Sequence, residues 1–320
     1  MMNDERCTAI NGRACIRTLR GTESRVANSL ARLWWSYRQL GASRTFRKAL
    51  RNLSRGVGVA ATTGPASGTP NIEAMRTCSW IVHLPNTHAT EIEVSSQALA
   101  EFMEATKYPK YYYRGGKRLT HALWHYVGVM LAELSASDVV LDVGAQSGTW
   151  GHFVRRKYRC RVIDVDVEYP PGVHGDRVGA DAAHIPLPDR SVSRIVSFCA
   201  LNCFEGSADI RFFREASRLL PPAGRLVIVP ICIGDEHLNL YDPRICTRED
   251  AFDVGARRVS WAGWGNNFGR WYDRAAFESR VAANLPGFEA LIVTIRHPFT
   301  EIPWPGTMHA AVFIKGAPAI

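Results

Sequence analysis

Hydrophobic and polar positions along residues 138–231 follow two alternating periods, and this pattern predicts strands separated by helices. Four apolar runs rich in Val and Ile predict buried strands, at 138–143, 160–165, 193–199 and 224–231. Helical spacing lies between them at 150–158 and 207–220, with Ser207 as the expected cap of the second helix. Because strands and helices alternate, we expect a parallel sheet with helices on both faces.

The segments on either side extend this pattern. Upstream, residues 91–134 are predicted to be helical. Downstream, Asp273 is expected to cap a helix over 273–284, and apolar runs at 289–295 and 309–315 predict two neighbouring antiparallel strands. We therefore divide the chain into three parts: a basic arm with its linker, 1–72, a helical lead-in or cap, 73–134, and a main domain, 135–320.

Charge is distributed unevenly between these parts. Residues 1–60 hold 12 of the 39 Lys and Arg and 3 of the 30 Asp and Glu, so the remainder has no net charge. The formal net charge of +9 is therefore a property of the arm. A neutral main domain has no net field to gather phosphates, which argues against a nucleic-acid partner.

The arm itself carries one amphipathic segment. Apolar positions over residues 25–40 follow helical spacing, with three Arg among them. Such a helix suits contact with an anionic membrane surface or a transit-like role, and packing on the domain or an appendage without fixed structure is the simpler interpretation. Residues 56–72, rich in Gly, Ala, Thr and Pro, are typical of a linker.

Cysteine and histidine positions give little sign of a metal site. The eight cysteines form no C-x-x-C pair and follow no apolar signal segment, so we expect reduced thiols and a cytoplasmic location. His121 and His125 lie four apart on a predicted helix, but residue 122 is Ala, so the H-E-x-x-H pattern is absent. We expect two helix-surface histidines and no metal.

The strongest local motif follows the first strand of the main domain. A buried strand ends at Asp142, and a glycine-bearing loop then leads into a helix. In a doubly wound sheet this position faces the ligand, and glycine lets the backbone approach it closely. Gly144, Gly148 and Gly151 are spaced G-x-x-x-G-x-x-G, which fits neither a dinucleotide fingerprint nor a P-loop.

The motif resembles the first motif of the class I S-adenosylmethionine-dependent methyltransferases, D-x-G-x-G-x-G. Asp142, Gly144 and Gly148 match it, Gln146 replaces the middle glycine, and Ala145 lies between. The resemblance is greatest to the group called type 11. It implies a Rossmann-like, doubly wound, mostly parallel seven-stranded sheet with an antiparallel edge hairpin, a helical amino-terminal extension and S-adenosyl-L-methionine as cofactor.

Later segments resemble the same family in order and spacing. The second strand ends in Asp164-Val165-Asp166, where the family's acid accepts hydrogen bonds from the ribose; Asp166 aligns best, with Asp164 as the alternative. Asp181-Ala182 resembles the stretch that holds the adenine amino group, and Cys199 follows the fourth strand. Two turns, 185–191 and 219–226, resemble the family's "LPFPDGSFD" and "LKPGGRL" turns.

The acceptor side is less defined. An insert over 232–272, after the fifth strand, could cover an apolar or ring-shaped acceptor or simply be an added packed subdomain; its aromatic residues are Tyr241, Phe252, Trp261, Trp264, Phe268, Trp271 and Tyr272. His237, Tyr272 and Asp273 are the candidates for a general base. Tyr111, Tyr112 and Tyr113 could close the pocket from the amino-terminal side.

The sequence thus predicts a methyltransferase that acts on a small-molecule acceptor, most simply at oxygen, in natural-product, lipid or glycan biosynthesis. Two alternatives stay open: a methyltransferase of nucleic acid or protein that uses the basic arm as a tether, and a catalytically inactive fold that binds the cofactor or a partner. Gln146 and the pair Asn202-Cys203, where relatives often carry Glu-His, favour the second. The oligomeric state is not indicated.

Overall fold

The computed structural model describes most of the chain from residue 78 onward. The described residues are 78–109, 115–244, 246, 251–262, 266–299 and 308–317; the side chains of Val82 and of 115–117 are excepted. The predictions for the arm, for membrane contact through residues 25–40, for Tyr111 to Tyr113 and for Trp264 lie outside this set.

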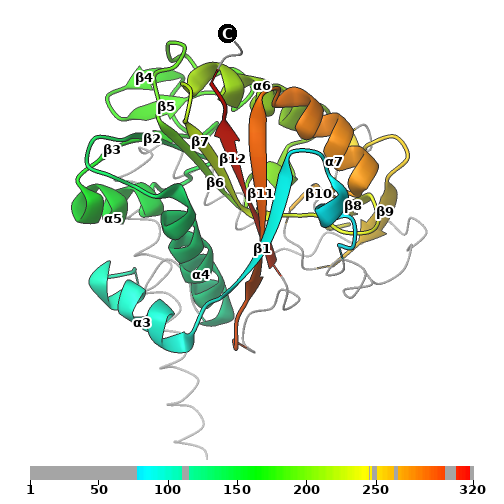
Figure 1. The fold of residues 1–320 in the computed structure, drawn as a ribbon, viewed down its shortest axis with the longest axis horizontal. Coiled ribbons are helices and arrows are strands. Elements are labelled where there is room, and N and C mark those ends of the chain that lie inside the picture. Colours follow the sequence, from blue (N-terminus) through cyan, green and yellow to red (C-terminus); the bar gives the residue numbers. More distant parts are fainter. Residues whose placement is uncertain are drawn as a thin grey trace, which may run out of the picture.

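A nine-stranded sheet forms the centre of the fold (Figure 1), in the order β1-β11-β12-β7-β6-β2-β3-β5-β4. Its strands are β1 (Thr87–Glu93), β2 (Val139–Val143), β3 (Arg161–Val165), β4 (Gly172–His174), β5 (Arg177–Gly179), β6 (Arg194–Phe198), β7 (Arg225–Ile231), β11 (Phe288–Arg296) and β12 (Met308–Lys315). The central pairs β7-β6, β6-β2 and β2-β3 are parallel, whereas β12 is antiparallel to both of its neighbours. The mostly parallel, Rossmann-like α/β fold is confirmed.

Helices cover both faces of this sheet. They are α3 (Ser96–Ala105), α4 (Gly115–Ala132), α5 (Thr149–Tyr158), α6 (Ala208–Leu219) and α7 (Arg274–Arg280), with short 3-10 turns at Ile81–His83, Leu201–Cys203 and Ala282–Asn284. Val140 and Val162 pack with α4 and α5, and Leu141 and Ile163 pack with α6 and α7. Alternate residues of one apolar run therefore fill two separate cores, which is why each run is continuous.

Three details of the sequence-based prediction are wrong. Residues predicted to be helical from 91 onward begin in β1, a strand that lies parallel to β11 at the sheet edge. The β11-β12 hairpin therefore lies inside the sheet, which has nine strands and not seven. Ser207 precedes α6, but its side chain does not cap the helix; its hydroxyl accepts a hydrogen bond from Arg211 at 2.6 Å.

The insert forms a second, smaller sheet. Its three strands, in the order β10-β8-β9, are β8 (Leu238–Tyr241), β9 (Arg257–Ser260) and β10 (Gly269–Trp271). Leu240, Val259 and Trp271 form a core of their own between these strands. The insert is thus a packed subdomain with regular structure.

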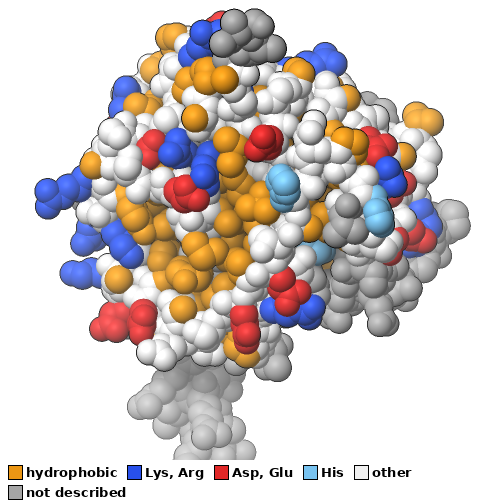
Figure 2. Space-filling view, in the orientation of Figure 1, with side chains coloured by type: hydrophobic (Ala, Val, Ile, Leu, Met, Phe, Trp, Pro, Cys, Tyr) orange, Lys and Arg blue, Asp and Glu red, His pale blue; other side chains and the backbone are white. Residues whose placement is uncertain are grey.

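The surface in the view of Figure 2 is unevenly divided. Hydrophobic side chains gather over α4 and the neighbouring strands, and basic side chains lie toward α5, whose last turn holds Arg155, Arg156 and Lys157. Leu131 and Leu291 are partly buried and pack against the hydrophobic core on this face of the sheet. Among the helices that the structure describes, none has the length and hydropathy needed to cross a membrane.

Candidate functional site

A cavity of about 1070 Å³ lies at the carboxyl ends of the central strands. Asp142 and Val143 from the end of β2, Val165 and Asp166 from the end of β3, and Phe198 from the end of β6 line it. The chain runs from β2 to β3 on one side, while β6 and β7 lie on the other, so the cavity opens at the topological switch point. Its volume is at the upper end of the range for small-molecule sites.

The loop between β2 and α5 forms one wall. Gly144 and Gly148 have φ of 78° and 69°, in the left-handed region that glycine favours, and Gln146 has φ of 49°. A Cβ on Gly144 would lie 2.5 Å from the Cβ of Ala200. The glycine is thus required both by backbone conformation and by the close approach of the segment after β6.

Asp164 and Asp166, two residues apart, lie in different surroundings. Asp166 lines the cavity and accepts hydrogen bonds from the N–H groups of Gln146 (2.7 Å) and Glu168 (2.8 Å). Asp164 is outside the cavity lining, and its carboxylate bonds to the Arg155 guanidinium at 2.9 Å. Residues two apart in a strand face the same side, so the direction of the side chain does not separate Asp164 from Asp166. The difference is that β3 ends at Val165, and only Asp166 lies beyond the strand end, where it can reach the cavity.

Asp142 is a buried carboxyl in an acidic wall. It is 2% exposed and lines the cavity. Burial raises its pKa well above the ordinary value, and the negative charges of Asp164 and Asp166 raise it further. This wall therefore favours a ligand that carries positive charge close to Asp142.

The far end of the same wall contains Asp181 and Ala182. Both line the cavity, and Asp181 Oδ1 accepts a hydrogen bond from the N–H of Ala183 at 2.9 Å. Ala145 lines the cavity too, and Gly148 lies at the start of α5 beside Asp164. The structure therefore gathers the predicted cofactor residues around one cavity, except for Asp164 and Gly148, which lie behind its wall.

The opposite wall is less polar. Cys199, with φ of 51°, lies beside Phe198 at the end of β6, and burial raises the pKa of its thiol. His125 also lines the cavity; its imidazole packs against Phe198 with ring centroids 4.8 Å apart, and its Nδ1 is 2.8 Å from the hydroxyl of Tyr108. Burial, and then the charge of His121, hold the pKa of His125 well below the ordinary value, so it is neutral at pH 7.

Residues 141–228 match a protein-family model described as a methyltransferase domain. This part of the chain is a class I S-adenosylmethionine-dependent methyltransferase domain. The match begins in β2 and ends in β7, so it spans the glycine loop and both acidic strand ends. The match, together with this geometry, identifies an enzyme with S-adenosyl-L-methionine as its cofactor.

Solved structures of methyltransferases are similar to part of this chain at low sequence identity and low TM-score. A Burkholderia thailandensis 1,6-didemethyltoxoflavin-N1-methyltransferase is 15% identical over 62% of this chain and 79% of that one, with a TM-score of 0.41. A Haloferax volcanii methyltransferase, solved in complex with the Trm112 activator, is 15% identical over 63% of this chain and 94% of that one, with a TM-score of 0.41. Human N-acetylserotonin methyltransferase is 12% identical over 62% of this chain and 55% of that one, with a TM-score of 0.36. No curated protein matches the chain in sequence.

The three residues suggested as a base all lie outside the cavity lining of the methyltransferase. His237 bonds to Asp253 at 3.1 Å, and Tyr272, fully buried, donates its hydroxyl to Asp209 at 2.9 Å. Asp273 caps α7 by accepting a hydrogen bond from the N–H of Ala276 at 2.8 Å. Each side chain therefore already has a structural partner outside the cavity lining.

The aromatic residues of the insert also serve packing, where the described residues include them. Tyr241 packs on Phe252, and Phe252 on Phe268, with centroids 5.3 and 6.2 Å apart. The insert reaches the cavity instead through Ala251 and Asn266. For the described aromatic residues, the interpretation as a packed subdomain is therefore supported.

Sequence reasoning missed the contribution of α4 to the site. His121 and His125 were expected on the helix surface, yet both line the cavity, and His125 is only 5% exposed. Their spacing of four does place them on one face of the helix. The only further sign that His125 is buried was the pair of apolar residues next to it in sequence. Among the described residues, no group of His, Cys, Asp or Glu is arranged to hold a metal ion.

Proposed function

We propose that the β2, β3 and glycine-loop side of the cavity holds S-adenosyl-L-methionine. Asp166 would accept hydrogen bonds from the ribose hydroxyls, and Asp181 from the adenine amino group, because a carboxylate oxygen suits each of these donors. The loop from Gly144 to Gly148 would lie along the methionine part, where Gly144 has no side chain to obstruct it.

The charge of the cavity wall supports this assignment. Asp142 is buried with a raised pKa, beside the carboxylates of Asp164 and Asp166, and Arg155 bonds to Asp164. S-adenosylmethionine carries a sulfonium and an ammonium group, which would lower the free energy of keeping Asp142 ionised. This fit between an acidic wall and a cationic ligand is the observation that carries the proposal.

When bound, S-adenosylmethionine supplies a methyl group that is already activated by the sulfonium. The residues of the chain therefore need to orient the two reactants in line and to exclude water. Holding both in the reacting geometry can supply about 7–11 kcal/mol of the barrier. Phe198 and Trp150, whose ring centroids are 5.2 Å apart, provide an apolar part of the cavity wall.

We further propose that the acceptor is a small molecule, methylated at oxygen, in natural-product, lipid or glycan biosynthesis. The loop after β6 and the insert residues Ala251 and Asn266 enclose the remaining part of the cavity, which favours a compact acceptor. His125 offers a neutral imidazole that can hydrogen-bond to an acceptor hydroxyl, and the buried Nε1 of Trp150 has no partner among the described residues. Both groups suit an acceptor oxygen.

A labelling experiment tests the nature of the acceptor. The full chain is incubated with methyl-labelled S-adenosylmethionine and with three separate fractions of a cell extract: metabolites below about 1 kDa, RNA and protein. We expect label in the metabolite fraction, in a methyl ether that base treatment does not cleave. Label in RNA or protein would contradict the small-molecule proposal, and label as an N-methyl product would contradict methylation at oxygen.

We also infer that the enzyme works in the cytoplasm. The six cysteines among the described residues are all free, which suits a reducing compartment. Cell fractionation with an antibody to the chain tests this inference, and recovery of the protein outside the cytoplasmic fraction would contradict it.

A further inference from the structure

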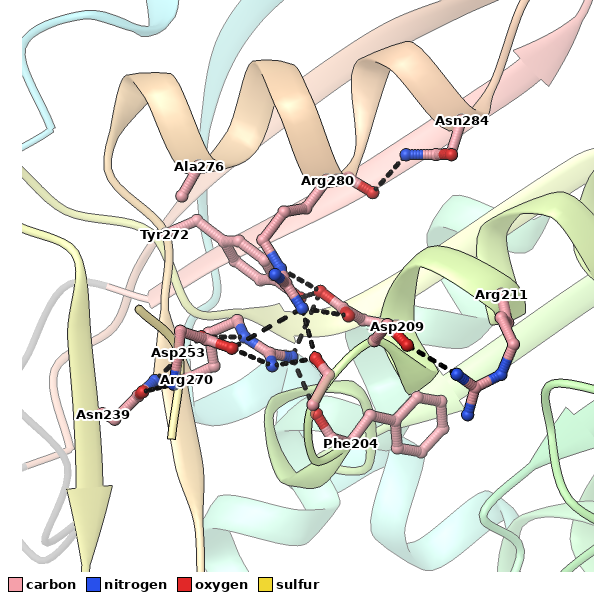
Figure 3. Close-up of polar contacts among 12 residues, drawn as sticks. Phe204, Asp209, Arg211, Asn239, Asp253, Arg270, Tyr272, Ala276, Arg280 and Asn284 are labelled. Carbon is pink, nitrogen blue, oxygen red and sulfur yellow. Dashed lines mark hydrogen bonds and ion pairs between the residues drawn. The ribbon is translucent and has the colours of Figure 1, made fainter. Parts of the chain in front are cut away.

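A buried group of four charged residues connects the insert to the methyltransferase domain. Arg270 on β10 and Arg280 on α7 face Asp209 on α6 and Asp253 in the insert (Figure 3). Arg270 has a side-chain exposure of 0%, as has Asp209. Two arginines and two aspartates balance in charge, which a set of ions this deeply buried requires.

Hydrogen bonds fix both guanidinium groups in place. Arg270 binds Asp253 with two parallel bonds, of 2.6 and 2.8 Å, and lies 3.1 Å from Asp209. Arg280 binds Asp209 in the same two-pronged way, at 2.9 and 2.7 Å. His237 and Asn239 complete the surroundings of Asp253, each 3.1 Å from its Oδ2.

These ion pairs leave further N–H groups of both arginines directed at backbone carbonyls. Arg270 donates to the carbonyl of Phe204 at 2.7 Å and to the carbonyl of Gly206 at 2.8 Å, and Arg280 also donates to Gly206. The two carbonyls are 66 and 64 residues away from Arg270 in sequence. Arg270 thus bridges the insert and the loop between β6 and α6.

That loop is a wall of the cavity. Phe204, Glu205, Gly206 and Ser207 all line it. In a trans peptide the N–H points opposite to the preceding carbonyl, so the amides of Glu205 and Ser207 face away from the arginines. The arginines hold the loop from behind, while its other side borders the cavity.

We propose that Arg270 is a positioning residue for the acceptor side of the active site. It acts through the carbonyls of Phe204 and Gly206, and it thereby links the insert to the acceptor side of the cavity. The proposal rests on the function proposed above. It assigns no contact between Arg270 and a reactant.

Arginine is suited to this task in a way that lysine is not. A planar guanidinium can bind a carboxylate with two bonds and still donate to two carbonyls, whereas an ammonium group has three donors at one point. Burial alone would lower the pKa of Arg270, but its hydrogen bond to Asp253 and the negative charges of Asp209 and Asp253 together outweigh that effect, so the group stays charged. Arg270→Lys therefore keeps the charge while it releases the loop.

The test uses the full chain in complex with S-adenosylhomocysteine. Cys203, half-buried at the cavity wall, reports on the loop through its rate of labelling by N-ethylmaleimide, and Cys160, buried in the far core, reports on global loosening. Mass spectrometry measures both rates together with amide exchange over residues 204–208. Arg194→Lys is the matched control, because Arg194 donates to the carbonyl of Ala132 at 2.9 Å and pairs with Asp138 away from the cavity.

For Arg270→Lys we expect Cys203 labelling and exchange over 204–208 to rise about 10-fold, with Cys160 and the affinity for S-adenosylhomocysteine unchanged. With the acceptor fraction identified by labelling, half-saturation for that fraction rises while half-saturation for S-adenosylmethionine does not. Unchanged Cys203 labelling, an equal rise at Cys160, or the same effect in Arg194→Lys would overturn the proposal.

A second variant covers the case in which Arg270→Lys does not fold. Arg270→Met combined with Asp253→Asn removes one charge of each sign, so no ion is left unpaired, and the same rise at Cys203 is expected. If the wild-type chain binds no S-adenosylhomocysteine, the proposed function fails. The labelling of the ligand-free chain then still decides whether Arg270 holds the loop.

Discussion

The two sides of the cavity are built in different ways. On the glycine-loop side, backbone conformation and nearby carboxylates form the wall, and the bond from Gln146 to Asp166 spans 20 residues. On the insert side, buried arginines hold the wall through bonds that span 64 to 74 residues. The first side depends on local turns of the chain, whereas the second depends on the packing of separate elements.

This difference predicts where mutations act. Changes on the glycine-loop side should alter cofactor affinity directly, because these residues border the ligand. Changes in the arginine group should alter stability and the acceptor side, because an unpaired buried ion costs about 3–5 kcal/mol. Substitutions at Gly144, at Asp166 and Asp164, at Asp142 and at Asp273 test that division.

Gly144→Val should have the largest effect on cofactor binding. A side chain there would adopt a strained φ of 78° and lie 2.5 Å from the Cβ of Ala200, so the loop must shift into the cavity. We expect the affinity for S-adenosylhomocysteine to fall at least about 100-fold, measured by calorimetry. Gly175→Val is the control, since its φ of 64° is similarly strained but no atom lies within 4 Å. Equal affinities in both variants would contradict the assignment of this wall.

Asp166→Asn and Asp164→Asn compare two neighbouring carboxylates. We expect Asp166→Asn to weaken S-adenosylhomocysteine binding about 10-fold or more, through loss of a charge-assisted hydrogen bond. Asp164→Asn should leave binding within about 2-fold, because its carboxylate is outside the cavity lining. Burial raises the pKa of Asp164, so removal of this charge offsets the loss of the bond to Arg155, and the free energy of unfolding should change by less than about 1 kcal/mol. Calorimetry and urea unfolding measure the two effects, and the reverse order would assign the ribose contact to Asp164.

Asp142→Asn should stabilise the ligand-free protein while weakening binding of the cationic cofactor. The folded pKa of Asp142 is raised, so its carboxyl costs stability as pH rises above the unfolded pKa of about 3.9. The variant lacks that loss, and its free energy of unfolding at pH 7 should exceed that of the wild type by about 0.5–2 kcal/mol. Urea unfolding at pH 4 and pH 7 measures the difference in free energy of unfolding between the variant and the wild type. If the variant were less stable than the wild type at pH 7, ionised Asp142 would not destabilise the folded protein.

Asp273→Ala should have the smallest effect on the site. Loss of the cap on α7 should lower the free energy of unfolding by about 1 kcal/mol. Binding of S-adenosylhomocysteine and methyl transfer should stay unchanged, because Asp273 is outside the cavity lining. A selective loss of methyl transfer in a stable variant would restore Asp273 as a base.

The sequence predicted the glycine-loop side well because its signals are local. The run from Val139 to Gly148 encodes a buried strand, a turn and a helix start within ten residues, and the structure has all three. What spacing could not decide was the orientation of neighbouring carboxylates. Asp164 and Asp166 differ in their access to the cavity only because β3 ends at Val165.

The insert side could not be predicted because its contacts join distant residues. Nothing near Arg270 in the sequence indicates that its guanidinium bonds to the carbonyl of Phe204. His125 was missed for the same reason: helical spacing gave its face on α4, but not that β6 ends with Phe198 against that face. The strand β1 was assigned to a helix because it lies at the sheet edge, where five of its seven residues are exposed and the apolar alternation is lost.

We propose that the cavity beside Gly144 and Asp166 binds S-adenosylmethionine. Calorimetric titration of the full chain with S-adenosylmethionine, S-adenosylhomocysteine and NAD in parallel tests it most directly. We expect micromolar binding of the first two and none of NAD, with Asp166→Asn weakening both. A folded chain that binds neither, or that binds NAD instead, would contradict it.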